Sequence, residues 1–182
     1  MLRVTIIVGE PARHFPLCRP SLPFVIRQKV TLDIATLAAF LHIIYSMPSA
    51  VVKWLQNKQF VGIDSSKHSV VLSTQDEANS VGCRPAEMLL VSLASCVAVD
   101  VVEILAKKRT PLSALEIDIR GEQDPEPPWA YRKIHLTFRV RGDGLTPAGV
   151  EQAIHLAEEK YCSVSATVKG VAQVTWDYRI ED

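Results

Sequence analysis

One stretch of the sequence decides the fold: PAEMLLVSLASCVAVDVVEILAKKR, at residues 85–109. Pro85 suits the first turn of a helix, where its missing N–H costs no hydrogen bond, and the cations at 107–109 suit the C-terminal end of the helix dipole. The middle of the stretch is apolar almost all round, which a helix facing water could not tolerate. We therefore predict a helix of roughly 25 residues, about 37 Å long, at the centre of the fold.

Short strands are predicted on both sides of this helix. Before it, residues 51–55, 60–63 and 70–72 have the pattern of a three-stranded meander. After it, residues 115–120 and 134–140 alternate apolar and polar side chains, as half-buried strands do. Strands in blocks, without repeated βαβ units, favour an α+β fold with largely antiparallel sheets around the long helix.

The C-terminal part adds a second helix and a last strand. Thr146 and Pro147 are typical of an N-cap and a first helical turn, and the helix is predicted to end near Tyr161. Residues 174–180 alternate again and predict a closing strand. The expected order of elements is βββ-α-ββ-α-β.

The first 46 residues differ in character from the rest and extend none of these patterns. They carry four prolines in their first half, and they have the layout of neither a transit peptide nor a signal peptide. We expect residues 1–46 to be a poorly ordered extension, or to lie upstream of a true start at Met47. Residues 47–182 are expected to form one domain.

Composition excludes several classes of protein. The 182 residues carry 20 basic and 20 acidic side chains, so no overall field favours nucleic acid or an anionic membrane surface. The apolar run at 88–99 is too short to span a bilayer, which favours a soluble protein. The four cysteines are too sparse for a disulfide scaffold and include no CxxC pair, so we expect a reducing cytoplasm.

The cysteines are the leading candidates for chemistry, because a thiol is the most nucleophilic side chain near neutral pH. Cys96 lies mid-helix among apolar neighbours, where a cysteine can equally be a small packed hydrophobe. Cys162 lies at the end of the second helix, before a possible new helical turn, and a thiol at a helix N-terminus has a lowered pKa. A packed cysteine is the alternative there too. Cys83 and Cys18 have no such setting.

Metal and cofactor sites are not expected. His155 and Glu158 are one helical turn apart and could share a metal, but no third ligand has matching spacing and no HExxH motif occurs. A solvated helix face is the preferred interpretation of this pair. Phosphate loops and dinucleotide-binding glycine motifs are also missing from the sequence.

Two segments together resemble a known family. PAEMLLVSLASC at 85–96, followed by DVVEIL at 100–105, resembles the central helix of OsmC-like proteins, and EKYCSVS at 159–165 is similar to their second cysteine motif. The spacing of the two segments, the preceding meander and the closing strand also match. The resemblance therefore covers nearly all of residues 47–182.

The resemblance implies an intertwined homodimer with two cysteine sites at the subunit interface, and reduction of organic hydroperoxides in oxidative-stress defence. It implies that Cys96 attacks the peroxide and that Cys162 resolves the product as a disulfide, which a dithiol reductant then reopens. Glu87 is a candidate for the residue that orients the reacting groups. No cofactor is implied.

This sequence departs from the peroxidase branches where they activate the thiol. Those branches use an arginine held by a glutamate, but the carboxylate position falls on Ala86 here, and residues 47–83 contain no arginine. The sequence therefore resembles the less characterised OsmC-like branch. Lys53, Lys58 and Arg84 are the plausible substitute cations. A cation is needed to favour the Cys96 thiolate, because Cys96 is several turns from the helix N-terminus and the helix dipole has little effect there.

Two other functions remain open. An apolar pocket lined by the long helix would suit a non-enzymatic carrier of apolar ligands, or a thiol-redox sensor, as well as an enzyme. A cation close to Cys96 would favour the enzyme, and its absence would favour the carrier or sensor. Alternatively, both cysteines are packed core and the protein acts through its dimer surface.

Overall fold

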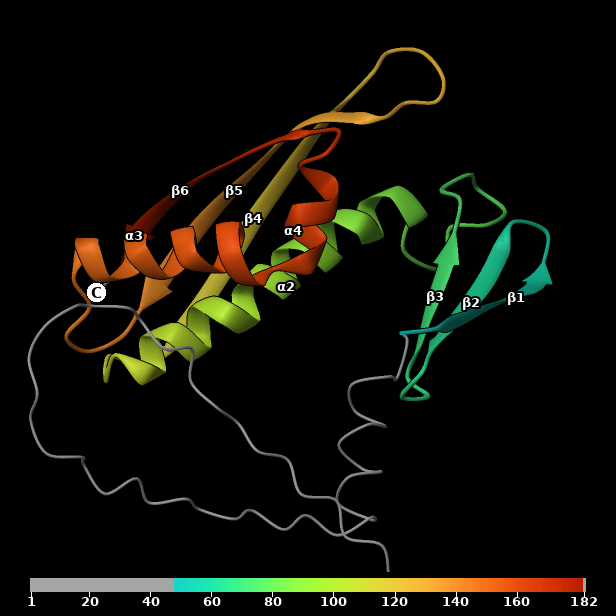
Figure 1. The fold of residues 1–182 in the computed structure, drawn as a ribbon. Coiled ribbons are helices and arrows are strands. Elements are labelled where there is room, and N and C mark those ends of the chain that lie inside the picture. The colour runs from blue at the N-terminus through green and yellow to red at the C-terminus, as the bar shows by residue number, and fades with distance from the viewer. Residues whose placement is uncertain (1–47, 182) are drawn as a thin grey trace, which may run out of the picture. The chain divides into compact units, whose positions relative to one another are not determined.

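A computed structural model describes residues 48–181 of the chain (Figure 1). The predicted extension 1–46 lies outside these residues, so the domain boundary stays a prediction. In chain order the elements are β1 (Ala50–Gln56), β2 (Gln59–Asp64), β3 (Ser69–Ser73), α2 (Pro85–Lys107), β4 (Ala114–Gln123), β5 (Tyr131–Arg141), α3 (Pro147–Leu156), the π-helical turn η1 (Ala157–Tyr161), α4 (Ser163–Val168) and β6 (Gln173–Ile180).

The α+β class is confirmed, with one addition to the predicted order. The short helix α4 follows the second helix before the last strand. Two sheets of three strands form, in the orders β1-β2-β3 and β4-β5-β6. The first is the predicted meander, in which β2 and β3 pair antiparallel.

The second sheet is only partly antiparallel. β4 and β5 pair antiparallel, as expected, but β5 and β6 pair parallel from Lys133 opposite Gln173 to Val140 opposite Ile180. The chain leaves β5 at one end, returns through α3 and α4, and enters β6 in the same direction. This segment is therefore a single β-α-β crossover, which the absence of repeated βαβ units in the sequence did not reveal.

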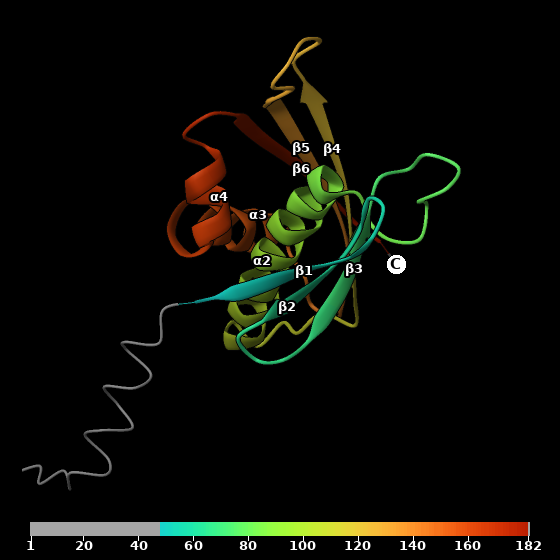
Figure 2. The same cartoon turned by 90° about the vertical axis from the view of Figure 1, so that its right-hand side faces the viewer.

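The core lies between the β4-β5-β6 sheet and the helices α2 and α3, which lie along one face of the sheet (Figures 1 and 2). β5 alternates strictly, so that Ile134, Leu136, Phe138 and Val140 are buried against the helices. Its intervening side chains, including Arg139, face the other way. The sheet is therefore hydrophobic on one face only.

Helix α2 contributes a single buried stripe to this core. Leu93, Val97, Val101 and Leu105 repeat every four residues and are almost completely buried. Other apolar side chains of the same helix, such as Val99 at 66% exposure, face outward. The helix is therefore central as predicted, but one chain covers only part of its apolar surface.

By length and composition, α2 is also able to cross a membrane. The expectation of a run too short to do so considered only residues 88–99, whereas the helix has 23 residues. This criterion is also met by core helices of soluble proteins, and the buried stripe of α2 packs into the protein core.

The β1-β2-β3 sheet has no hydrophobic core of its own. All the buried hydrophobic side chains among residues 48–181 lie between Leu93 and Ala172, outside this sheet. Its buried side chains are the polar Gln59 and Ser73, which face each other across β2 and β3. Every residue of β1 is exposed. A sheet of this size needs a covered hydrophobic face to be stable.

Candidate active site

Cys162 lies where the second helix passes through a π-helical turn into α4. The turn η1 closes with a hydrogen bond of 2.8 Å from the backbone N–H of Cys162 to the carbonyl of Ala157, five residues earlier. Cys162 is then the N-cap of α4, and its Sγ accepts a hydrogen bond of 3.2 Å from the backbone N–H of Ser165. The side chain is only 3% exposed. Backbone hydrogen bonds thus fix this thiol on both sides.

The fold brings Cys96 and Cys162 together from elements far apart in the sequence. Helix α2 packs against both η1 and α4. Cys96 is half-buried and packs on the cluster that contains Cys162, close enough to influence the ionisation of that thiol. Both are free thiols. The two thiols thus lie on the same part of the hydrophobic core.

The environment of Cys162 favours its protonated form. Burial, and after it the neighbouring Cys96, raises the pKa of Cys162 to about 11. The backbone N–H groups of Ser165 and Val164 act in the opposite direction and do not compensate. The prediction of a lowered pKa from a helix start is therefore wrong. Helix α4 has only six residues, and the sulfur is buried at its start.

This pKa leads to a direct test. We expect alkylation of Cys162 by iodoacetamide to reach its half-maximal rate near pH 11, since only the thiolate reacts and roughly one molecule in a thousand is ionised at pH 8. In Cys96→Ser the midpoint moves to lower pH, because the second cause of the shift is removed. Mass spectrometry of the labelled peptide across pH measures both profiles, and a wild-type midpoint at or below that of free cysteine contradicts the assignment.

Glu87 is not brought to the thiols within the chain. It lies exposed in the first turn of α2 and forms an ion pair of 3.2 Å with Arg84. It also faces Tyr131, whose pKa is raised first by burial and then by the Glu87 charge. Glu87 precedes Cys96 by nine residues, or about 14 Å along the helix axis.

The expected substitute cations are also engaged elsewhere or distant in the structure. Lys58 pairs with Asp76 at 3.5 Å. Arg84, paired with Glu87, precedes Cys96 by about 18 Å along the helix axis. Lys53 lies on the exposed strand β1 and forms no ion pair within residues 48–181. Within one chain, the ion pairs of Lys58 and Arg84 are therefore made with carboxylates away from the two thiols.

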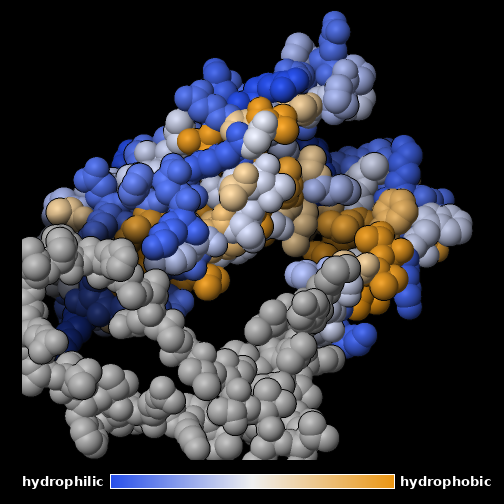
Figure 3. All heavy atoms as spheres, viewed as in Figure 1, coloured by the Kyte–Doolittle hydropathy of each residue, from blue (hydrophilic) through white to orange (hydrophobic). Residues whose placement is uncertain are grey.

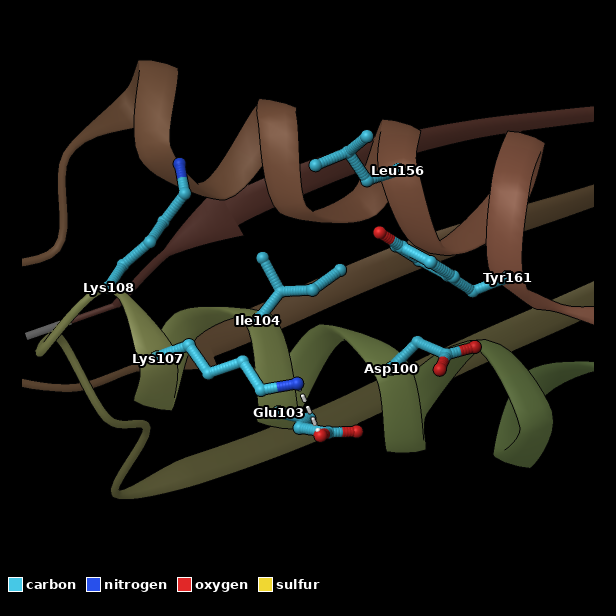
Figure 4. A pocket seen from close by; sticks show the side chains of 7 residues that line it. All are labelled: Asp100, Glu103, Ile104, Lys107, Lys108, Leu156 and Tyr161. Carbon is cyan, nitrogen blue, oxygen red and sulfur yellow. Dashed lines mark ion pairs between the residues drawn. The ribbon is translucent and has the colours of Figure 1, made fainter. Parts of the chain in front are cut away.

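A cleft of about 330 Å³ opens between α2 and the end of the second helix (Figure 4). Its lining residues are Asp100, Glu103, Ile104, Lys107, Lys108, Leu156 and Tyr161. Asp100 is one helical turn after Cys96 and Tyr161 directly precedes Cys162, so the cleft adjoins the thiol pair. Charged side chains surround its apolar floor, and Glu103 and Lys107 are paired at 2.6 Å. The cleft is thus lined by the long helix but is not purely apolar.

A second polar group lies beside Cys162 and was not predicted from the sequence as part of the site. Glu158 is buried, and its Oε1 accepts hydrogen bonds from Lys169 Nζ at 2.7 Å and from Ser165 Oγ at 3.4 Å. Glu158 was assigned to a solvated helix face with His155, and that assignment is wrong for Glu158. Glu158 follows the buried Ile154 by four residues, so helical periodicity places it on the inward face, and the sequence did not show that Lys169 pairs with it there.

Known proteins resemble this chain in sequence and in fold. Residues 75–177 match the family model described as OsmC-like protein. The protein YhfA of Escherichia coli K12 is 35% identical over 133 residues, which cover 72% of this chain and 96% of YhfA.

Two solved structures share the fold at lower identity. An OsmC-like protein from Mycoplasma pneumoniae has a TM-score of 0.67 at 15% identity, covering 76% of this chain and 99% of the other. The organic hydroperoxide resistance protein OhrB of Bacillus subtilis has a TM-score of 0.52 at 15% identity, covering 72% and 98%. On the family match and the identity to YhfA, the chain belongs to the OsmC-like family.

Proposed function

We propose that this protein is a two-cysteine thiol peroxidase that reduces organic hydroperoxides in oxidative-stress defence. Membership of the OsmC-like family supports a peroxidase-like role in the stress response. The observation that carries the finer proposal is the adjacency of two free thiols, Cys96 from the central helix and Cys162 from the start of α4. A cycle through a disulfide needs such a pair.

The proposed cycle has three steps. The Cys96 thiolate attacks the outer oxygen of the hydroperoxide, the O–O bond breaks, and the alkoxide leaves and takes up a proton as the alcohol. The sulfur is now a sulfenic acid. The Cys162 thiolate then attacks that sulfur and displaces hydroxide, so that a disulfide forms. The released hydroxide takes up a proton and becomes water. A dithiol reductant reopens the disulfide by exchange and is itself oxidised.

The two cysteines have different roles in this proposal. Cys162 is buried and has a raised pKa, so it is a poor first nucleophile. Cys96 is half-buried on the helix that lines the cleft, and is therefore the thiol that meets the substrate. Cys162 needs to react only once a sulfenic acid is beside it.

We further propose that the working form is a homodimer in the cytoplasm. Exposed hydrophobic side chains gather over the β1-β2-β3 sheet and along α2 (Figure 3). Such surfaces mark protein interfaces or ligand grooves. A second copy of the chain covers them, and closes an apolar space beside Cys96 for the organic part of a hydroperoxide. The described cysteines are free, as in a reducing compartment.

Glu87 has a limited role in this proposal, which is to hold Arg84. The distance of this pair from Cys96 along the helix favours a second candidate function on the same dimer, a thiol-redox sensor or a carrier of apolar ligands. A peroxidase needs a cation near the attacking thiol to favour the thiolate, whereas a carrier does not.

Turnover separates the two candidates. With dihydrolipoamide as the dithiol, we expect the full-length protein to consume cumene hydroperoxide catalytically, and to do so faster than hydrogen peroxide, because the apolar surfaces favour an apolar substrate. Absorbance of the oxidised dithiol follows the reaction. A rate equal to that of free cysteine at the same thiol concentration overturns the peroxidase, and the sensor or carrier then replaces it.

A further inference from the structure

We propose that Glu158 and Lys169 are positioning residues, whose shielded ion pair holds Cys162 against Cys96 and sets how readily the two sulfurs join. The inference rests on the proposed two-cysteine function, because it assigns a role within that pair. The Glu158 side chain is 4% exposed, and the Lys169 side chain that pairs with it is 26% exposed. This is the most buried ion pair among residues 48–181.

The contacts form a continuous path from this ion pair to the sulfur. Lys169 Nζ donates to Glu158 Oε1 at 2.7 Å, and Ser165 Oγ donates to the same oxygen at 3.4 Å. The backbone N–H of Ser165 donates to Cys162 Sγ at 3.2 Å. Ser165, which is completely buried, is thus held by Glu158 through its hydroxyl and holds Cys162 through its amide.

The same pair ties together the two ends of the segment that carries Cys162. Glu158 belongs to the π-helical turn before the cysteine, and Lys169 is the C-cap of α4 after it. The ion pair therefore closes the chain around Cys162 from both sides. Turns of this kind occur frequently at functional sites.

Stability alone does not explain this arrangement. A shielded ion pair loses much of its Coulomb energy to desolvation, so well-packed hydrophobic residues can often replace it without loss. Burial would lower the pKa of Lys169, but the hydrogen bonds and charges of Glu158 and Glu159 outweigh it and raise that pKa. The ammonium is therefore firmly charged. What the pair specifies is geometry, namely the position of α4 relative to the π-helical turn.

Positioning matters because disulfide formation is intramolecular. Its equilibrium depends on the effective concentration of one sulfur at the other, which falls when either side chain can move away. Releasing Glu158 from Lys169 allows the start of α4 to move, and Cys162 with it. The thiol pair then loses part of its tendency to close.

Neighbouring residues provide matched controls. Glu159 Oε1 also lies 2.7 Å from Lys169 Nζ, but the Glu159 side chain is 53% exposed and makes no contact with Ser165. Glu159→Gln therefore removes a negative charge from the same lysine and leaves the groups that link Lys169, Glu158, Ser165 and Cys162 in place. Lys169→Arg keeps the cation, and Lys169→Met removes it with little change in length.

The test is a redox titration of full-length protein in glutathione buffers, with the Cys96–Cys162 disulfide measured by mass spectrometry. Glu158→Gln and Lys169→Met are each expected to lower the equilibrium constant for disulfide formation about tenfold, which makes the reduction potential about 30 mV less negative. The double variant is expected to match the single ones, because the pair acts as a unit. Lys169→Arg and Glu159→Gln are expected to stay within threefold of wild type.

Equal effects of Glu158→Gln and Glu159→Gln, or wild-type potentials in both Glu158→Gln and Lys169→Met, overturn the proposal. Glutathione oxidises the pair without any peroxide, so the outcome is independent of peroxidase activity. If the reduction potentials shift as expected but the protein does not turn over hydroperoxide, the proposed peroxidase function is wrong and the positioning role stands. If Glu158→Gln does not fold, Lys169→Met and Lys169→Arg complete the comparison.

Discussion

Replacing Cys96 by serine is expected to abolish the reaction with organic hydroperoxides. The rate of thiol loss after mixing with cumene hydroperoxide should fall by at least about 1,000-fold, equal to about 4 kcal/mol in the activation barrier. The physical reason is that a serine hydroxyl is not ionised near neutral pH, and a neutral hydroxyl is a poor nucleophile towards oxygen. Stopped-flow mixing with quenched thiol counting measures the change.

Cys162→Ser serves as the matched variant, because it removes the other thiol of the same pair. It is expected to lose one thiol at the wild-type rate and to stop at a sulfenic acid on Cys96, which dimedone traps and mass spectrometry locates. Wild type loses both thiols and gives no dimedone adduct. Fast thiol loss in Cys96→Ser would assign the attack to another cysteine and remove the proposed roles.

The long helix could be predicted because local chemistry determines both of its ends. Pro85 marks its start, and the structure begins α2 at that residue. The two sheets follow from alternation of apolar and polar side chains, and β5 buries the alternating set that the pattern indicates. These features depend on residues close together in the sequence. For the same reason, they carried the family resemblance.

The parallel pairing of β5 with β6 could not be predicted in the same way. A strand of period two has the same pattern whichever direction its neighbour runs. The direction of β6 depends on the path through α3 and α4, which is a property of the whole crossover. The sequence showed where the strand lies and left its partner open.

The two thiols of the candidate site could be predicted from the sequence, but the environment around them could not. The family motifs identified Cys96 and Cys162, and the structure brings both to one place. The pKa of Cys162 was predicted in the wrong direction, because burial is a tertiary effect and outweighs the local helix start. Glu158 was missed because a carboxylate is rarely buried without a partner, and the sequence did not show that Lys169 pairs with it.

Replacing Trp54 by glutamate is expected to separate the proposed homodimer into monomers. Trp54 is 67% exposed on β1, a strand whose residues are all exposed and whose sheet has no hydrophobic core of its own. Tryptophans in such positions are frequent hot spots, and a two-fold interface contains each substitution twice. If each copy of the substitution costs roughly 2 kcal/mol of binding free energy, the two copies together raise the dissociation constant of the dimer about a thousandfold.

Trp129→Glu is the control for this experiment. Trp129 is similarly exposed, at 56%, but it lies in the connection between β4 and β5 rather than on β1 or α2. Sedimentation velocity at micromolar concentration should show a dimer for wild type and Trp129→Glu, and a monomer for Trp54→Glu. A monomeric wild type would remove the second copy from the proposed site. The exposed stripe of α2 beside Cys96 would then need another partner to cover it, because an apolar helix face of this size is not stable against water.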